Sequence, residues 1–218
     1  MTTNVIEQRT VPSTAGNVIH GALRYDLFIW LASLGREQAY REKTLNLAGL
    51  KSGELVLDVG CGTGTLAIAA KRRVGPAGRV YGIDPSPEMI ARARKKAKKA
   101  CVEVTFENAL AEKMPFTGGT FDAVLATVML HHLGRKARQQ CACEMRRVLR
   151  PGGRVLAVDF GVAAREKRNL LAHFHRHGHV KLSELIAVLE EVGLKSVESG
   201  AVGIGDLQFV LAAAPGGA

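Results

Sequence analysis

Short apolar runs alternate with amphipathic stretches along most of the chain from residue 54 onward. The run at 55–59 is five residues long, is followed by glycines, and predicts a buried parallel strand. Amphipathic stretches between such runs predict helices, and Gly or Pro marks where they begin and end. The predicted strands are 55–59, 79–84, 102–106, 121–126, 154–160, 196–198 and 208–212, and the predicted helices between them are 65–73, 86–100, 138–149 and 182–192.

This order of elements predicts an α/β fold, a Rossmann-like, doubly wound sheet of seven mostly parallel strands with an antiparallel last strand. Two further helices are expected before the sheet, at 22–34 and 36–50. We therefore expect a helical N-terminal lid at 1–50 and a sheet domain at 51–214. Ligands of such sheets bind beyond the carboxyl ends of the strands, so the lid and the loops after the fourth and fifth strands should form the pocket walls.

Composition fits one globular unit in a reducing compartment. The chain has 218 residues, 47% of them hydrophobic, and no apolar run nears the roughly 20 residues of a membrane-spanning helix. No secretory signal is recognisable at the N-terminus, and the four cysteines form no zinc-site pattern. These features predict a cytoplasmic protein with free thiols.

The chain is basic, with a formal net charge of +10. Such a charge permits attraction to nucleic acid or to anionic membranes without demanding either. Six basic residues gather at 92–99, with no aromatic residue among them, which favours the solvated face of a helix. Nucleic acid is not expected as a partner, and peripheral contact with an anionic membrane stays open.

A glycine-rich turn follows the first predicted strand. Gly60, Gly62 and Gly64 are spaced G-x-G-x-G, whereas a dinucleotide fingerprint would need a glycine where Thr65 stands. The strand also ends near a carboxylate, Asp58, which would repel a pyrophosphate. A cationic or zwitterionic ligand that approaches the glycine backbone closely fits this turn better.

Polar residues end the next two strands as well. Asp84 closes the second strand 20 residues after Gly64, where an acidic side chain can accept both hydroxyls of a ribose. Asn108 and Ala109 follow the third strand, where an adenine edge would lie. The sequence therefore predicts a nucleoside ligand without a phosphate chain.

Five linked segments carry a family resemblance. They are LDVGCGTGTLAIAA, GRVYGIDPSPEMIARAR, ENALAEKMPF, FDAVLATVMLHHL and LRPGGRVLAVDF. In this order they resemble the class I S-adenosylmethionine-dependent methyltransferases, in the branch typified by the ubiquinone and menaquinone biosynthesis (UbiE-like) enzymes. The resemblance covers roughly residues 54–160 and implies S-adenosylmethionine as cofactor and S-adenosylhomocysteine as product.

The resemblance also implies roles for individual residues. The first motif would cradle the methionine portion, Asp84 would bind the ribose, and Asn108 stands where relatives usually have aspartate against the adenine amine. Thr127 would lie beside the methionine end and the acceptor. The implied cofactor-binding residues are Asp58, Gly60, Cys61, Gly62, Gly64, Asp84, Pro85, Met89, Asn108, Ala109 and Thr127.

Methyl transfer from a sulfonium is an in-line displacement, so alignment in a dry pocket supplies most of the catalysis. A general base is needed only where the acceptor loses a proton. His131 and His132, after the fourth strand, are candidates for that base, or for a role in ordering the loop or the cofactor. Tyr25 in the first lid helix is a candidate pocket residue; core packing and membrane contact are alternatives for that helix.

The leading prediction is a methyltransferase acting on a small organic acceptor that is uncharged or weakly polar. Methylation of a lipid head group or quinone at the membrane surface is the alternative. A nucleic-acid methyltransferase, a nicotinamide-dependent oxidoreductase and an inactive cofactor-binding scaffold fit the motifs less well. His173, His175, His177 and His179 alternate in a stretch that suits a pocket rim or a solvated loop; no metal site is predicted, and the oligomeric state is left open.

Overall fold

The structure is a computed structural model that describes residues 37–161 and 179–216. The predicted lid helix at 22–34, with Tyr25, and the histidines at 173–177 lie outside the described residues. Within the described part, no helix is long and apolar enough to cross a membrane.

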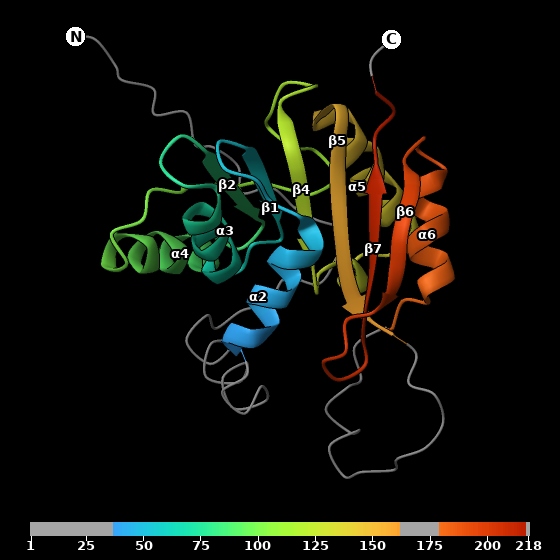
Figure 1. The fold of residues 1–218 in the computed structure, drawn as a ribbon, viewed down its shortest axis with the longest axis horizontal. Helices are drawn as coiled ribbons and strands as arrows, with labels where there is room; N and C mark the ends of the chain where they lie inside the picture. The colour runs from blue at the N-terminus through green and yellow to red at the C-terminus, as the bar shows by residue number, and fades with distance from the viewer. Residues whose placement is uncertain (1–36, 162–178, 217–218) are drawn as a thin grey trace, which may run out of the picture.

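Seven strands form a single sheet in the order β3-β2-β1-β4-β5-β7-β6. The strand β7 pairs antiparallel with both of its neighbours, while the other pairs are parallel (Figure 1). The predicted fold class is therefore confirmed, including the antiparallel last strand. The strands are β1 Leu55–Val59, β2 Arg79–Asp84, β3 Thr105–Asn108, β4 Phe121–Thr127, β5 Leu149–Phe160, β6 Lys195–Ala201 and β7 Leu207–Ala213.

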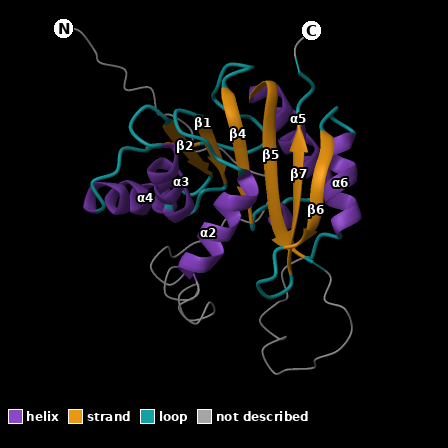
Figure 2. Ribbon diagram, in the orientation of Figure 1, coloured by secondary structure: helices purple, strands orange, loops and turns teal. Residues whose placement is uncertain are grey.

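Helices cover both faces of this sheet (Figure 2). Three of them share one hydrophobic cluster with one face, and two share a second cluster with the other face. The first group is α2 Glu37–Ala48, α3 Thr65–Val74 and α4 Pro87–Lys99; the second is α5 Arg135–Val148 and α6 Leu182–Glu190. A short 3-10 helix, η1 Leu130–His132, follows β4.

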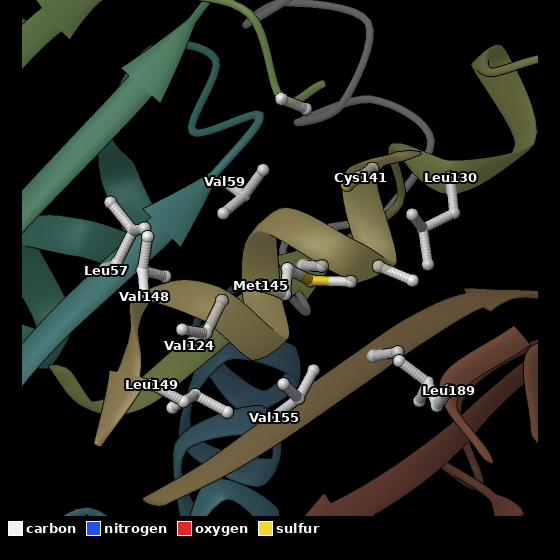
Figure 3. Packing of buried hydrophobic residues seen from close by; sticks show 14 of the residues in the cluster. Leu57, Val59, Val124, Leu130, Cys141, Met145, Val148, Leu149, Val155 and Leu189 are labelled. Carbon is white, nitrogen blue, oxygen red and sulfur yellow. The ribbon is translucent and has the colours of Figure 1, made fainter. Parts of the chain in front are cut away.

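The central strands are mostly apolar because each of their faces meets a helical layer; the buried exceptions include Asp58, Asp122 and Asp159. Along β1, Leu57 and Val59 belong to the cluster with α5 and α6, and Val56 to the cluster with α2, α3 and α4. Figure 3 shows the first cluster from close by, with Met145 of α5 among the labelled side chains. Burying one such side chain contributes about 1.5–3 kcal/mol, so the two clusters dominate the stability of the sheet.

The predicted third strand at 102–106 is wrong at its start, since β3 begins at Thr105. The reason is the end of α4. Cys101 has φ +52°, Val102 donates its backbone N–H to Ala97 O at 3.0 Å, and Cys101 donates to Lys98 O. These are the bonds of a Schellman cap, which engages the backbone before the strand can begin.

The fifth strand is longer than predicted. It begins at Leu149 rather than Arg154 and runs through Pro151, with an irregular register between Phe121 and Ala123 on the neighbouring strand. The predicted helix at 138–149 instead begins at Arg135 and ends at Val148. Leu149 pairs with Phe121, which is a tertiary contact. The Pro-Gly-Gly sequence that follows Leu149 suggested a turn instead, so the early start of the strand was not predicted.

A charged cluster fastens α2 to the sheet. The Arg154 guanidinium on β5 donates to both carboxylate oxygens of Glu54, at 2.9 and 2.8 Å. It also donates to the carbonyl oxygens of Ala48 and Gly49 at the end of α2. Burial opposes ionisation of Glu54, but the hydrogen bonds and the charge of Arg154 outweigh it and lower the pKa of Glu54.

Candidate active site

The carboxyl ends of β1, β2 and β4 lie side by side. Val59 is in register with Ile83 on β2 and with Ala126 on β4. The glycine turn after β1 therefore lies beside Asp84 and Thr127, as the sequence predicts. Thr127 is half-buried.

Backbone hydrogen bonds shape the glycine turn. The N–H of Cys61 donates to Ile83 O at 2.9 Å, and the N–H of Gly64 donates to Cys61 O at 2.9 Å. Gly60 has φ +67° and Gly64 has φ +76°, a region where L side chains are strained. At both positions protein atoms already occupy the space of a Cβ, Met129 at Gly60 and Phe106 at Gly64.

The Asp84 carboxylate ties β2 to this turn. Its Oδ2 accepts a hydrogen bond from the N–H of Gly62 at 3.0 Å, and its Oδ1 accepts one from the N–H of Ser86 at 2.9 Å. Burial raises the pKa of Asp84, and the two backbone hydrogen bonds act in the opposite direction. Each oxygen can accept a further hydrogen bond, so the side chain can still bind two hydroxyls.

Asp58 is a buried carboxyl group in β1, and burial raises its pKa more than the weakly acting backbone N–H of Ala67 lowers it. Asp58 is 1% exposed, and neither of its oxygens accepts a hydrogen bond of normal geometry from the described residues. Burial, followed by the negative charge of Asp84, raises its pKa to about 8. A carboxyl group in this state is stabilised by a cationic partner.

The predicted adenine-binding residues lie at the ends of β2 and β3. Asn108 donates through Nδ2 to the backbone oxygen of Asp84 at 2.9 Å, an orientation that leaves its Oδ1 to accept from another group. Ala109 donates its N–H to the same oxygen at 3.2 Å. Met89 is buried in the first turn of α4, where its backbone N–H donates to the side chain of the N-cap Ser86. Pro85, which precedes Ser86, is half-buried.

His131 is held by a buried aspartate that the sequence analysis did not single out. The ring Nδ1 of His131 lies 2.6 Å from Asp159 Oδ1, and its backbone N–H donates to Asp159 Oδ2 at 3.0 Å. The side chains of His131 and Asp159 are 3% and 0% exposed. The ring of His132 lies against that of His131, with centroids 3.9 Å apart and the ring planes tilted by 45°.

A strained residue introduces this segment. Val128 has φ +54°, which is rare for a β-branched residue, and it donates its N–H to Val158 O at 2.7 Å. Strain of this kind occurs mainly where surrounding structure fixes a functional segment. The segment from Thr127 to His132 is thus fixed by β5 at both of its ends.

Other sequence-predicted residues are placed as follows. Cys61 is buried within the turn, and Cys141 is buried while Cys143 on the same helix is exposed, as the helical spacing predicts. Tyr25 lies outside the described residues. Ser86 opens α4 as the predicted start of that helix at residue 86 indicates. Asp159 and Met129 were not predicted as site residues: the carboxylate at the end of a strand was a signal for Asp159, whereas nothing in the sequence pointed to Met129.

The described residues fit S-adenosylmethionine. Its methionine portion is zwitterionic and its sulfonium is cationic, so binding would favour the ionised form of the buried Asp58, whose pKa is raised to about 8 without a cationic partner. Asp84 retains acceptor capacity for ribose hydroxyls, and Asn108 retains an amide oxygen for an exocyclic amine. No phosphate-binding charge is needed in such a site.

Much of the chain is similar to known methyltransferases. Residues 56–153 match the family described as a methyltransferase domain. A demethylmenaquinone methyltransferase of Thermus thermophilus is 39% identical over 139 residues, which cover 64% of this chain and 62% of the relative. A ubiquinone/menaquinone biosynthesis C-methyltransferase UbiE of Pseudomonas aeruginosa is 36% identical over 172 residues, which cover 78% and 65%.

Among solved structures, an S-adenosylmethionine-dependent methyltransferase from Aquifex aeolicus superposes with a TM-score of 0.67 at 27% identity. The match covers 79% of this chain and 88% of that one. Residues 56–153 therefore form a methyltransferase domain, and the fold resembles that of a class I S-adenosylmethionine-dependent methyltransferase. Within that class it is related to the C-methyltransferases of quinone biosynthesis. The chain spans less than two thirds of the length of these curated relatives.

Proposed function

We propose that this protein transfers the methyl group of S-adenosylmethionine to a small aromatic acceptor of the hydroquinone type. S-adenosylmethionine as the donor is supported mainly by one observation. The Asp58 carboxylate has no hydrogen-bond partner of normal geometry among the described residues, and it lies beside a glycine turn that Asp84 holds in place. The support for the acceptor class is the relatedness to enzymes named for demethylmenaquinone and ubiquinone biosynthesis.

Each side chain of the donor site has a distinct task in this proposal. Asp58 offers negative charge to the methionine end, Asp84 accepts from the ribose hydroxyls, and Asn108 accepts from the adenine amine. When bound, the cofactor supplies a methyl group already activated on a sulfonium. The protein therefore has to align donor and acceptor and keep water out, which can contribute about 7–11 kcal/mol in favourable cases.

A hydroquinone acceptor gives His131 a task. A ring carbon becomes a better nucleophile when a neighbouring hydroxyl loses its proton, and a histidine can accept that proton near neutral pH. The proposed acceptor wall also includes His132, whose ring contacts that of His131, and Thr127 at the end of β4. Tyr25 belongs to the same proposal from the lid, which we still expect at residues 1–50 before a catalytic domain at 51–214.

The test is a methyl-transfer assay on the purified chain. Prenylated 1,4-naphthohydroquinone, its oxidised quinone, a simple thiol and phosphatidylethanolamine vesicles are each incubated with S-adenosylmethionine. S-adenosylhomocysteine and the methylated product are measured by mass spectrometry. We expect turnover with the hydroquinone and none with the quinone, whose hydroxyl protons are absent. Turnover of the thiol or the lipid alone would contradict the proposed acceptor.

A prenylated acceptor dissolves in membranes, so we propose a cytoplasmic enzyme that contacts an anionic membrane peripherally. The support is charge: residues 65–104 carry ten Lys or Arg and three Asp or Glu. In a flotation assay, the protein should bind vesicles that contain phosphatidylglycerol at low salt and should dissociate from them at high salt. Equal flotation with neutral vesicles would contradict an electrostatic contact.

A further inference from the structure

Asp159 has a hydrogen-bond pattern that fixes the orientation of its carboxylate. Oδ1 accepts the backbone N–H of Phe160 at 2.8 Å, and Oδ2 accepts the backbone N–H of His131 at 3.0 Å. The side chain is fully buried at the end of β5. Two fixed backbone donors leave the carboxylate no freedom to turn, so it presents Oδ1 to the ring of His131.

This pattern assigns the tautomer of His131. An ionised carboxylate only accepts hydrogen bonds, so the Nδ1 atom, 2.6 Å from Oδ1, must be the donor. In the neutral ring the proton is then on Nδ1 and the lone pair is on Nε2. No hydrogen bond to that Nε2 is found among the described residues. In the pair, Nε2 is therefore the proton-accepting atom of the ring, and Asp159 of β5 fixes the other side of that ring.

The surrounding structure keeps the pair in place. The ring of His131 is packed between His132 and Phe160, with centroids 3.9 and 5.5 Å away. The guanidinium of Arg138 donates to the carbonyl oxygens of Leu130 and Leu133, on either side of η1. The imidazole is therefore held by packing as well as by Asp159, which suits a group that must meet an acceptor in one geometry.

We propose that Asp159 is a positioning residue for methyl transfer, holding His131 in the tautomer whose Nε2 takes a hydroxyl proton from the acceptor. This inference rests on the proposed function. The proton moves from the acceptor oxygen to Nε2, and the electron pair left behind is delocalised into the ring. The new bond joins the methyl carbon to a ring carbon, while the bond from the methyl carbon to sulfur breaks and both of its electrons stay on sulfur.

The ring carbon that gains the methyl group then releases its hydrogen to water as a proton. His131 returns its proton to the acceptor oxygen, so that the ring is again neutral and the product is a methylated hydroquinone. Asp159 keeps its hydrogen bond to Nδ1 throughout and stabilises the imidazolium between the two proton transfers. One proton is released per methyl group, and no oxidant is consumed.

The experiment compares four variants of the full chain: Asp159→Asn, His131→Ala, the double variant, and Asp122→Asn as a matched control. Asp122 is also buried and also accepts a backbone N–H, that of Leu55. It lies near the start of β4, whereas the loop with His131 follows the other end of that strand. Thermal unfolding, the Kd of S-adenosylhomocysteine, and kcat and KM for prenylated naphthohydroquinone are measured for each.

We expect Asp159→Asn to lower kcat on the order of 100-fold, with KM and Kd changed by less than about threefold. Asp122→Asn should lose comparable thermal stability but keep its kcat. Adding Asp159→Asn to His131→Ala should cost no further activity, because the aspartate acts through the histidine. Additive losses, or an unchanged kcat in Asp159→Asn, would overturn the proposal.

Nitrogen NMR of 15N-histidine-labelled protein gives a readout independent of turnover. The resonances of His131, identified by their loss in His131→Ala, should show the Nδ1–H tautomer in the wild-type protein and a changed population in Asp159→Asn. An Nε2–H tautomer in the wild type overturns the proposal even if the variants fail to fold. If no hydroquinone is methylated while the Nδ1–H tautomer is found, the proposed acceptor fails and the proton transfer from a hydroxyl fails with it.

Discussion

The carboxylate of Asp84 accepts a hydrogen bond from the backbone N–H of Gly62 at 3.0 Å, joining the end of β2 to the glycine turn after β1. The residue expected to bind the ribose therefore also fixes the turn expected to hold the methionine portion. A second bond, from Ser86 N–H, ties the same carboxylate to the start of α4.

Replacing Asp84 should consequently weaken binding in two ways. We expect Asp84→Ala to weaken the binding free energy of S-adenosylhomocysteine by about 2–4 kcal/mol. Charge-assisted hydrogen bonds are each worth about 1.5–3 kcal/mol and do not add fully. Leaving the Gly62 and Ser86 amides unpaired should also lower the stability of the free protein by about 1–3 kcal/mol. Calorimetry and chemical denaturation measure both. An unchanged Kd would place the ribose elsewhere.

Gly60 tests the close packing of the turn. A Cβ built on it would lie 2.8 Å from Met129 Cβ, and its φ of +67° disfavours any L side chain. Gly119 has nearly the same φ, +68°, but open space around it. Gly60→Ala should therefore destabilise the protein by roughly 1–3 kcal/mol more than Gly119→Ala and should also weaken cofactor binding. Equal losses for the two variants would show that backbone strain alone matters.

Asp58 makes stability depend on pH in an unusual direction. With its pKa raised to about 8, the native protein retains a proton between pH 4 and 8 that the unfolded chain has released. Stability should therefore fall as pH rises through this window, by an upper limit on the order of 5 kcal/mol. The cationic cofactor should bind more tightly at the upper end of the window.

Denaturation with urea at several pH values, on the wild type and on Asp58→Asn, measures this contribution. The variant should lose most of the fall in stability between pH 4 and 8, although its buried amide lowers stability at every pH. The comparison therefore uses the slope rather than the absolute free energy. Identical slopes would show that Asp58 is ionised in the folded protein.

Substitution of Arg154 measures how strongly its hydrogen bonds attach α2 to the sheet. Its guanidinium donates to both oxygens of Glu54 and to two carbonyl oxygens at the end of α2, a geometry that lysine cannot reproduce. Arg154→Lys should lower stability by about 2 kcal/mol, since the pair is only partly buried. Arg73→Lys, at an exposed pair with Glu42, should cost less than about 1 kcal/mol in the same thermal-denaturation assay.

Much of this fold can be predicted because local signals and tertiary structure agree. Four of the five residues in the strand before Gly60 are apolar, and glycines follow it, so its end and the turn were correctly located from the sequence. Asp84 likewise ends a strand both in the pattern and in the structure. The start of β3 was missed because the helix cap at Cys101 uses a positive φ that is uncommon for cysteine.

The partner of His131 could not be predicted for a different reason. Asp159 lies 28 residues further along the chain, and only the pairing of β4 with β5 brings the two together. A single aspartate at the end of a strand is common in α/β sheets and points to no particular partner. The sequence therefore indicated which loop carries the chemistry, whereas the hydrogen bonds that orient its histidine depend on tertiary structure.

Isothermal titration with S-adenosylhomocysteine measures whether this site binds S-adenosylmethionine for methyl transfer. Wild-type protein and Asp84→Ala are titrated side by side, with Gly119→Ala as a control away from the site. We expect one binding site per chain in the wild type and the control, and binding at least about 30-fold weaker in Asp84→Ala. Absence of binding in the wild type, or equal affinity in all three proteins, would contradict this prediction.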